Sequence, residues 1–392
     1  MTLEPSLTNS HPVATPFACP ECGCEISLTA EYCACSGCGE LFPVKDGIPQ
    51  VFDRPEPDTL CPLTLHEIER ALAQHPDLRG WRLQLVGRHT ARASEILEFK
   101  RTSQVCMPRL MLKHRTRSLS RQASAEHVRQ EFRSLQELWY RSDAAFRATL
   151  PRPVALLPEI GAALFERVPG ISLTNVLKLQ ANSVTGPLRR NEICRIAADI
   201  GRWLRKLHAL NYSSPVPQAT TAYLANLAYW LRKAKDQGLD RATAAAVWDA
   251  AARSAFEARD QRVLCTGAHG DFIPQNILVQ RNAVAVIDFE SFRRPAPIYE
   301  DLGFFVAHCH LMTHRWLYSA SVANDMAAAF LEAYGENLRA DLLDLYVLKA
   351  MATMFADQYA PRSLAWKYAE RLRRIKSGLA LVDLGVAAVR TR

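Results

Sequence analysis

Residues 269–279 read HGDFIPQNILV, and the string AVAVIDFE follows at residues 283–290. Asp271 stands five residues before Asn276, and Asp288 comes twelve residues after it. An aspartate can orient a hydroxyl group and accept its proton, and carboxylate and amide oxygens are the ligands that Mg2+ prefers. The apolar residues between Asn276 and Asp288 predict a hairpin on which the second carboxylate arrives. Phosphoryl transfer from a nucleotide needs these parts.

The order HxDxxxxN, apolar strand, IDFE resembles the aminoglycoside phosphotransferase and choline kinase-like family, and it is similar to the protein-kinase pattern. The resemblance implies an α+β, bilobal protein kinase-like fold, with a small β-rich N-lobe and a large helical C-lobe. It implies ATP and Mg2+ as cofactors and Asp271 as the catalytic base. It also implies Asn276 and Asp288 as magnesium ligands, and His269 as a buried support of the catalytic loop.

Hydrophobic patterning upstream agrees with this order of lobes. Residues 81–87, 94–101 and 108–115 predict three strands, and apolar residues at helical spacing predict a helix over residues 124–141. Residues 151–170 predict two short strands that turn at residues 159–161. The remainder predicts mostly helix, with one strand-rich island; the helical segments are 191–210, 220–258, 299–312 and 320–388, and the island is 263–290.

Two charged side chains of this region match the family pattern. Lys113 ends an apolar strand and resembles the strand-3 lysine that contacts the α- and β-phosphates. Glu131 follows eighteen residues later on the predicted helix, where the family's lysine-pairing glutamate belongs. Taken alone, Glu131 is typical of a surface helix charge, and Glu126 and Glu137 are rival positions.

Two nucleotide-binding segments are less specific. LFERVPG, at residues 164–170, resembles the hinge between the lobes, where backbone groups of Glu166 to Val168 would bind the adenine edge; it is also typical of a strand that ends in a Pro-Gly turn. GRHTARAS, at residues 87–94, occupies the phosphate-loop position with a single glycine. Ser94 and the arginines beside it would then contact phosphate directly, or the arginines face solvent.

Two further residues are expected to have structural roles. The helix at residues 191–210 matches the family's helix ahead of the catalytic loop. His208 lies on this helix and is predicted to be a core residue. Asp301 corresponds to a family aspartate that organises the loop, although a plain helix-start carboxylate fits nearly as well. His308, His310 and His314 have offsets that do not place three nitrogens on one helix face, so they predict no metal site.

A cysteine cluster near the beginning of the chain predicts a structural zinc site. Two CxxC pairs are separated by twelve residues, a spacing typical of a zinc ribbon, and their cysteines are Cys19, Cys22, Cys35 and Cys38. Cys24 and Cys33 are alternative ligands. The ending ELFPVKDGIPQVF, at residues 40–52, resembles the methyltransferase-activating zinc-ribbon domains, which implies a docking module for a protein partner.

Composition sets limits on the remaining classes. The chain has 392 residues and a net charge of +8, and its 48% hydrophobic and 22% charged residues exclude wholesale disorder and a fibrous repeat. Residues 79–147 hold fifteen Lys and Arg against six Asp and Glu, which suits anionic partners or a solvated face. Nucleic acid is disfavoured because interleaved exposed aromatic residues are missing. With no apolar span and no secretion signal, we expect a cytoplasmic protein.

These observations predict five regions and one leading function. The regions are a disordered tail at 1–16, the zinc ribbon at 17–52, a linker and helix at 53–78, the N-lobe at 79–168 and the helical C-lobe at 169–392. The leading function is an ATP- and Mg-dependent phosphotransferase acting on a hydroxyl of a small molecule or glycan. Because residues 315–392 are not acidic, a neutral or anionic acceptor is favoured over an aminoglycoside. The alternative is a weakly catalytic scaffold whose ribbon recruits a partner enzyme.

Overall fold

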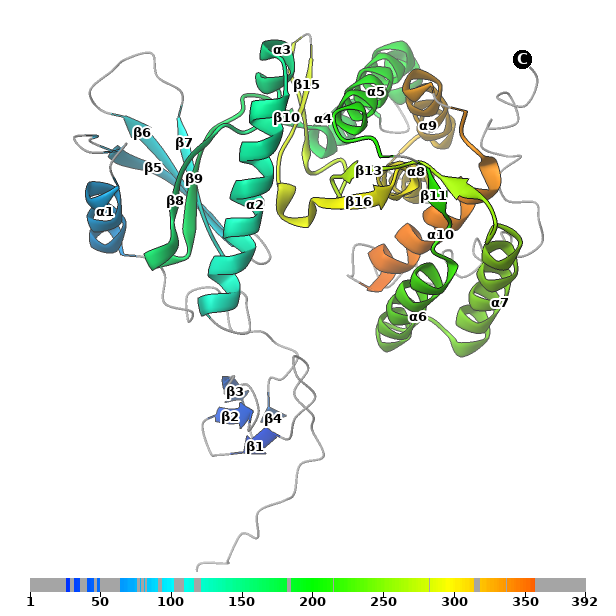
Figure 1. Cartoon of the computed structure of the whole chain (residues 1–392), viewed down its shortest axis with the longest axis horizontal. Coiled ribbons are helices and arrows are strands. Elements are labelled where there is room, and N and C mark those ends of the chain that lie inside the picture. The colour runs from blue at the N-terminus through cyan, green and yellow to red at the C-terminus, as the bar shows by residue number, and fades with distance from the viewer. Residues whose placement is uncertain are drawn as a thin grey trace, which may run out of the picture. The chain divides into compact units, whose positions relative to one another are not determined.

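The computed structural model of the chain falls into two compact units (Figure 1). One unit holds Met1–Arg129 and Val154–Phe165, and the other holds Gln130–Pro153 and Glu166–Arg392. The predicted bounds of the N-lobe, 79–168, and of the C-lobe, 169–392, stay predictions. The structure describes residues 26–28, 32–35, 41–45, 48–49, 64–75, 78, 81, 83–90, 94–101, 109–115, 121–181, 185–213, 215–281, 283–313, 318–335 and 337–356.

Four short strands near the beginning of the chain form an antiparallel sheet in sequence order. They are β1 (Ile26–Leu28), β2 (Tyr32–Cys35), β3 (Leu41–Lys45) and β4 (Ile48–Pro49). Cys35 ends β2, whereas Cys19, Cys22 and Cys38 lie outside the described residues, as do the alternative ligand Cys24 and the predicted tail. The zinc site therefore stays a prediction.

The first unit is built on a five-stranded sheet of order β5-β6-β7-β9-β8. Its strands are β5 (Leu83–Thr90), β6 (Ser94–Arg101), β7 (Leu110–Arg115), β8 (Pro153–Leu157) and β9 (Ala162–Glu166). Thr64 caps helix α1 (Leu65–Gln74) and forms a capping box with Glu67. Ile68 of α1 belongs to the same buried cluster as Leu97 and Leu112 of the sheet, so α1 covers the sheet. The predicted strands of this region are confirmed.

The second unit is mainly helical. It contains the later part of α2 (Arg121–Arg141), then α3 (Ala144–Arg147), α4 (Leu173–Gln180), α5 (Gly186–Ala209), α6 (Thr220–Asp236), α7 (Arg241–Glu257), α8 (Tyr299–Thr313), α9 (Ala320–Tyr334) and α10 (Ala340–Ala356). The predicted helix at 220–258 is two helices, because Gly238 takes a left-handed conformation after α6 and Asp240 caps α7. The β-rich region followed by a helical region is confirmed.

Short strands connect these helices and flank the loops at residues 269–276 and 287–292. They are β10 (Ile171–Ser172), β11 (Val216–Pro217), β12 (Arg262–Val263), β13 (Cys265–Ala268), β14 (Ile277–Val279), β15 (Val284–Val286) and β16 (Arg293–Pro297). Strand β13 pairs antiparallel with β16, and β14 pairs with β15. Helix α5 packs against α9 and β13, while α10 packs against α6, α7 and α8.

An aromatic core lies between α5, α8 and α9. Gly201 allows α5 and α9 to approach closely, because a Cβ there would lie 2.3 Å from the carbonyl oxygen of Phe330. Phe330 packs on Phe305 with ring centroids 4.2 Å apart, and Phe272 stacks on Trp203 at 6.1 Å. Phe272 is fully buried and belongs to the HGDF string, so its packing in this core anchors the string.

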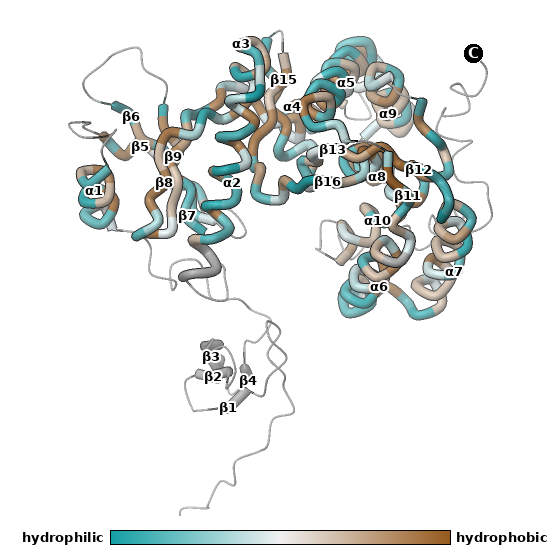
Figure 2. The backbone as a smooth tube through the Cα atoms, in the orientation of Figure 1, coloured by the Kyte–Doolittle hydropathy of each residue, from teal (hydrophilic) through white to brown (hydrophobic). Residues whose placement is uncertain are grey.

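Hydropathy along the chain follows this arrangement. Figure 2 shows hydrophobic residues along β8 and β9, and hydrophilic residues on the visible faces of α5 and α6. Within the described residues, no helix is both long and apolar enough to cross a bilayer.

Candidate active site

A hairpin brings the two halves of the motif together. Strand β14 begins directly after Asn276, and Ile277 pairs with Val286 of β15. Beyond this pair, the amide of Ile287 donates to the carbonyl oxygen of Asn276 at 2.9 Å. Asp288 is the next residue, so it leaves the hairpin at the end where Asn276 enters it. The predicted arrival of the second carboxylate on a hairpin is confirmed.

Asn276 fixes the position of Asp271. Its carboxamide nitrogen donates to the Asp271 carboxylate at 2.9 Å and to the Asp271 carbonyl oxygen at 3.0 Å. The loop between them is held by a bond from the Asn276 amide to the Ile273 carbonyl oxygen at 2.9 Å. Because these bonds use the nitrogen of the carboxamide, its oxygen is the atom that can bind a cation.

His269 supports the loop from inside, as predicted for a buried residue. Its side chain is fully buried, and its Nε2 lies 3.1 Å from the carbonyl oxygen of Ile287. Its Nδ1 accepts from the amide of Asp271 at 3.3 Å. A carbonyl only accepts and an amide only donates, so the ring carries a proton on Nε2. His269 thus connects the hairpin to the loop and positions Asp271.

Asp301, at the beginning of α8, organises the same loop. Its carboxylate accepts from the amides of His269 and Gly270 at 2.7 and 2.8 Å, and from His208 Nε2 at 3.1 Å. Burial raises the pKa of Asp301, but the hydrogen bond from His208, the electrostatic interactions with His208 and His269 and the Gly270 amide outweigh it, and the net pKa is lowered. Of the two readings of Asp301, the structure therefore favours the loop organiser.

His208 is a buried part of this network, as predicted for a core residue. It lies on α5 with no exposed surface, and its Nδ1 is 2.9 Å from the hydroxyl of Tyr334 on α9. Tyr334 is also fully buried, and the sequence analysis did not single it out. Its one sequence signal is the apolar periodicity of α9, which marks core positions without showing a hydrogen bond.

Gly270 is required between His269 and Asp271. Its φ of +81° lies in the left-handed region. A Cβ at this position would meet the carbonyl oxygen of Ser291 at 2.3 Å and Nη1 of Arg293 at 2.6 Å. The loop therefore lies against the beginning of β16.

Asp288 stands in a strained conformation beside two more carboxylates. It is the one non-glycine residue among those described with a positive φ, at 69°. Strained residues of this kind concentrate at functional sites. Carboxylate oxygens of Glu131, Asp288 and Glu290 lie within 4.8 Å of one another, and within the described ranges no other group of three His, Cys, Asp or Glu could hold a metal ion. Hard oxygen donors of this type fit Mg2+.

Glu290 is a functional candidate that the sequence analysis missed. It follows Asp288 by two residues and is the last residue of the string IDFE. The sequence signal for Glu290 is an acidic residue at the position where protein kinases have glycine. Glu131 is remote in sequence, so residue spacing alone does not show that it lies close to Glu290.

Burial separates Glu131 from its rivals on α2. Glu131 is 3% exposed, whereas the side chains of Glu126 and Glu137 are 60% and 43% exposed. Glu126 pairs with Arg129, and Glu137 pairs with Arg141 and Arg294. Glu131 is thus the buried carboxylate of this helix. Its pairing with Lys113, which belongs to the other unit, stays a prediction.

The remaining predicted residues lie as follows. Lys113 is a largely buried residue in β7, opposite Ile96 of β6. Ser94 begins β6 and is buried, and Arg88 pairs with the buried Glu95 at 3.0 Å. In the hinge segment, the amide of Glu166 donates to the carbonyl oxygen of Arg152 at 2.9 Å, and the half-buried Val168 belongs to no helix or strand. Their contacts with a nucleotide stay predictions.

Comparison with known proteins gives the following matches. Residues 101–343 match the phosphotransferase enzyme family. No match is found among curated proteins. A choline kinase from Cryptosporidium parvum Iowa II has 12% identity and a TM-score of 0.49, over 81% of this chain and 96% of that one. An aminoglycoside-3'-phosphotransferase of type VIII has 19% identity and a TM-score of 0.44, over 72% and 96%. A choline/ethanolamine kinase family protein from Mesorhizobium loti has 16% identity and a TM-score of 0.43, over 83% and 99%.

Proposed function

The chain belongs to the phosphotransferase enzyme family, and from this premise we propose that it transfers the γ-phosphate of ATP to a hydroxyl group of a small molecule or glycan. The expectation of a phosphotransferase enzyme is confirmed by the family match. The donor, the acceptor and the roles of single residues are the proposal.

The observation that supports the proposal is the arrangement around Asn276. Its carboxamide nitrogen donates to the Asp271 carboxylate at 2.9 Å, and its backbone carbonyl oxygen accepts from the amide of Ile287, the residue before Asp288. Asn276 thus connects Asp271, a carboxylate that can accept a proton, with the hairpin that leads to Asp288. The carboxylates of Glu131 and Glu290 lie near that of Asp288. A loop with a purely structural purpose has no need of this combination.

Asp271 acts as the base of the proposed reaction. Its carboxylate orients the acceptor hydroxyl and receives the proton as the hydroxyl oxygen attacks the γ-phosphorus. The new oxygen–phosphorus bond forms while the bond from the γ-phosphorus to the β,γ-bridging oxygen breaks, and ADP leaves. The bonds from Asn276 hold Asp271 in one orientation for this step, which is the main contribution of the loop.

The carboxamide oxygen of Asn276 and the carboxylate of Asp288 would hold Mg2+, with Glu290 and Glu131 next to them. Bound Mg2+ neutralises charge on the nucleotide phosphates. Lys113 would contact the α- and β-phosphates, and Ser94 would donate to phosphate. Backbone groups of Glu166 to Val168 would bind the adenine edge. Hydrogen bonds from His269 and Asp301 hold the loop that carries Asp271 and Asn276.

We also propose a zinc ribbon that docks a protein partner, with the metal bound by Cys19, Cys22, Cys35 and Cys38. A separate proposal is that the protein works in the cytoplasm. Metal analysis of the purified full-length chain should give one zinc per chain, and a Cys35→Ser variant should lose it. Equal zinc content in the variant would contradict this ligand set.

Turnover of ATP tests the proposed function. Purified chain with ATP, Mg2+ and a hydroxyl acceptor should form ADP, and Asp271→Asn should lower the rate by about 100- to 10,000-fold, because the base is lost while the geometry is kept. Asp199→Asn, a partly exposed aspartate of α5 that pairs with Arg195 and Arg202, is the matched control and should keep the wild-type rate. Equal rates for the wild type and Asp271→Asn would defeat the mechanism.

The scaffold alternative makes a different prediction. A scaffold would bind nucleotide without transferring phosphate, and a partner enzyme would co-purify through the ribbon. Thermal stabilisation by ATP with no ADP formed across a broad set of hydroxyl compounds would favour it. The buried network of His269, Asp301 and His208 weighs against it, because its one evident effect is to hold Asp271 and its loop.

A further inference from the structure

Arg293 lies against the catalytic loop. It begins β16 and pairs with Ala268 of β13, the residue directly before His269. Its Nη1 would be 2.6 Å from a Cβ placed on Gly270, so the guanidinium lies against this glycine. Asp271 is the next residue. A group that binds Arg293 is therefore close to the proposed base.

Arg293 is held by a carboxylate that it shares with a second cation. It forms an ion pair with Glu300 of α8, whose other oxygen accepts from Lys349 Nζ at 2.9 Å. The side chains of Glu300 and Lys349 are 10% and 11% exposed, whereas Arg293 is 43% exposed. Burial, and then the charge of Arg293, lower the pKa of Lys349. One carboxylate thus faces two cationic groups, with the guanidinium on the outside.

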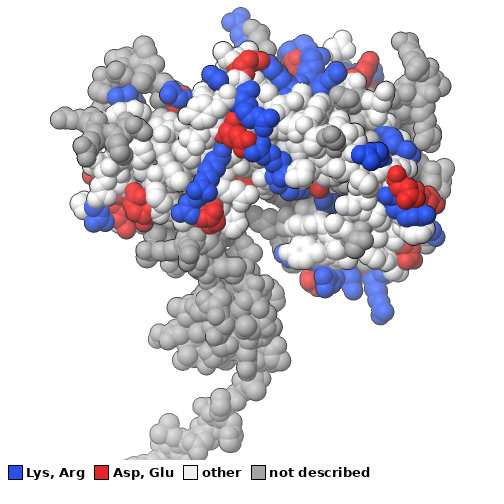
Figure 3. Space-filling model, in the orientation of Figure 1, with Lys and Arg blue, Asp and Glu red and all other residues white. Residues whose placement is uncertain are grey.

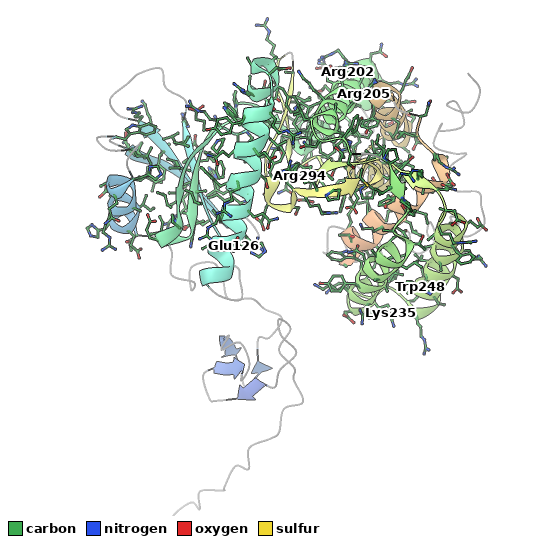
Figure 4. All side chains as sticks on the ribbon, viewed as in Figure 1. Glu126, Arg202, Arg205, Lys235, Trp248 and Arg294 are labelled. Atoms are coloured by element: carbon green, nitrogen blue, oxygen red, sulfur yellow. The ribbon has the colours of Figure 1, made fainter. Side chains whose placement is uncertain are left out.

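The next residue of β16 repeats this arrangement. Arg294 pairs with Glu137 of α2, and Glu137 also lies 3.5 Å from Arg141. Figure 4 labels Arg294 between α2 and β16, and Figure 3 shows blue side chains around red ones at this place in the same orientation. The carboxylate of Asp301 is already used by the loop amides and His208. Each of the two arginines at the beginning of β16 therefore shares its carboxylate partner with a second cationic group.

We propose that Arg293 binds an anionic group, a phosphate or a carboxylate, on the hydroxyl acceptor, with Glu300 and Lys349 as the residues that position it. This inference rests on the proposed phosphotransfer and names its substrate class. A guanidinium is suited to the purpose because its planar donors match two oxygens of a phosphate or carboxylate. The same charge repels a polycationic acceptor, which adds discrimination against that class.

Binding of inorganic phosphate tests the site without turnover. The nucleotide site is first filled with a non-hydrolysable ATP analogue and Mg2+, and phosphate is then titrated by calorimetry into the full-length protein. The wild type should bind phosphate, and Arg293→Gln should weaken binding at least tenfold, or about 1.4 kcal/mol. Arg293→Lys should fall between them, because it keeps the charge and loses the planar fork.

Arg202→Gln is the matched control. Arg202 is a 59% exposed arginine of α5 that pairs with Asp199, and Figure 4 shows it on α5. This variant should bind phosphate as the wild type does. Arg293→Gln should fold, because Lys349 and Glu300 remain as a balanced pair. Equal phosphate affinity in Arg293→Gln and the wild type, or no phosphate binding by the wild type, would overturn the proposal.

Kinetics with matched acceptors separates the two sources of the anion. Four test acceptors each carry a primary hydroxyl group: glycerol, glycerol 3-phosphate, glycerate and choline. Glycerol is neutral, glycerol 3-phosphate carries a phosphate, glycerate carries a carboxylate and choline carries a cationic group. An anionic member should be the better substrate, and Arg293→Gln should raise its KM tenfold or more while kcat changes less. A preference for choline, or an unchanged KM in Arg293→Gln, would overturn the proposal. If none of the four compounds reacts, the calorimetric titration with phosphate tests the proposal. Failure of the phosphotransfer itself would appear separately, as absence of ADP formation.

Discussion

His208 and Asp301 form a fully buried hydrogen-bonded pair beneath the catalytic loop, with His208 Nε2 3.1 Å from Asp301 Oδ2. The same carboxylate accepts from two amides of the loop. One side chain therefore connects α5, α8 and the residues directly before Asp271. The proposed base depends on a carboxylate that has no exposed surface of its own.

Replacing Asp301 should weaken both stability and turnover. Asp301→Asn leaves a carboxamide where two loop amides and a histidine donate, so we expect a loss of about 3–5 kcal/mol in the free energy of unfolding and a lower kcat. Urea unfolding and ADP formation measure the two effects. Asp199→Asn, in an outer ion pair of α5, should cost less than about 1 kcal/mol. Equal losses in the two variants would show that the buried network is not special.

The lowered pKa of Asp301 predicts a specific acid dependence. Because its folded pKa lies below the unfolded value of about 3.9, the ionised carboxylate contributes stability that is fully present above that pH. This contribution is lost as the pH falls through the folded pKa. The carboxyl carbon resonance of Asp301 should titrate below pH 3.9 in the folded protein. A midpoint above this value would contradict the inferred network.

Gly270 and Gly238 form a matched pair of positive-φ glycines. Gly270→Ala should cost about 1–2 kcal/mol for the left-handed backbone and should also displace the loop, because Ser291 and Arg293 fill the space of its Cβ. Gly238→Ala has the same kind of backbone penalty but no atom within 4 Å of the new Cβ. We expect kcat to fall steeply only in Gly270→Ala. A similar kcat in both variants would argue against close contact at the loop.

Local patterns in the sequence predicted much of this arrangement, and long-range relations were harder. The helical spacing of Val128, Phe132, Leu135 and Leu138 predicted α2, and all four are buried. The hairpin that returns Asp288 to Asn276 is also local, because it depends on two short apolar runs. By contrast, the bond from His208 to Tyr334 joins residues 126 positions apart, and periodicity alone shows only that both are core positions. The ion pair of Arg293 with Glu300, and that of Glu300 with Lys349, depend likewise on how β16, α8 and α10 pack.

Glu290 should influence metal dependence. If it stands beside the magnesium ligands, Glu290→Gln removes one negative charge from the group with Glu131 and Asp288, and the Mg2+ concentration for half-maximal ADP formation should rise several-fold. Glu257→Gln, an exposed glutamate at the end of α7, should leave that concentration unchanged. The result that would remove Glu290 from the site is an identical Mg2+ dependence in the two variants.

The metal site itself gives the most direct test, since it requires no acceptor. Crystals of the full chain with Mn2+ and a non-hydrolysable ATP analogue should show anomalous density about 2.0–2.3 Å from the carboxamide oxygen of Asn276 and a carboxylate oxygen of Asp288. The nucleotide phosphates should lie on the other side of the ion. Nucleotide bound elsewhere, or Mn2+ in contact with neither Asn276 nor Asp288, would contradict the account.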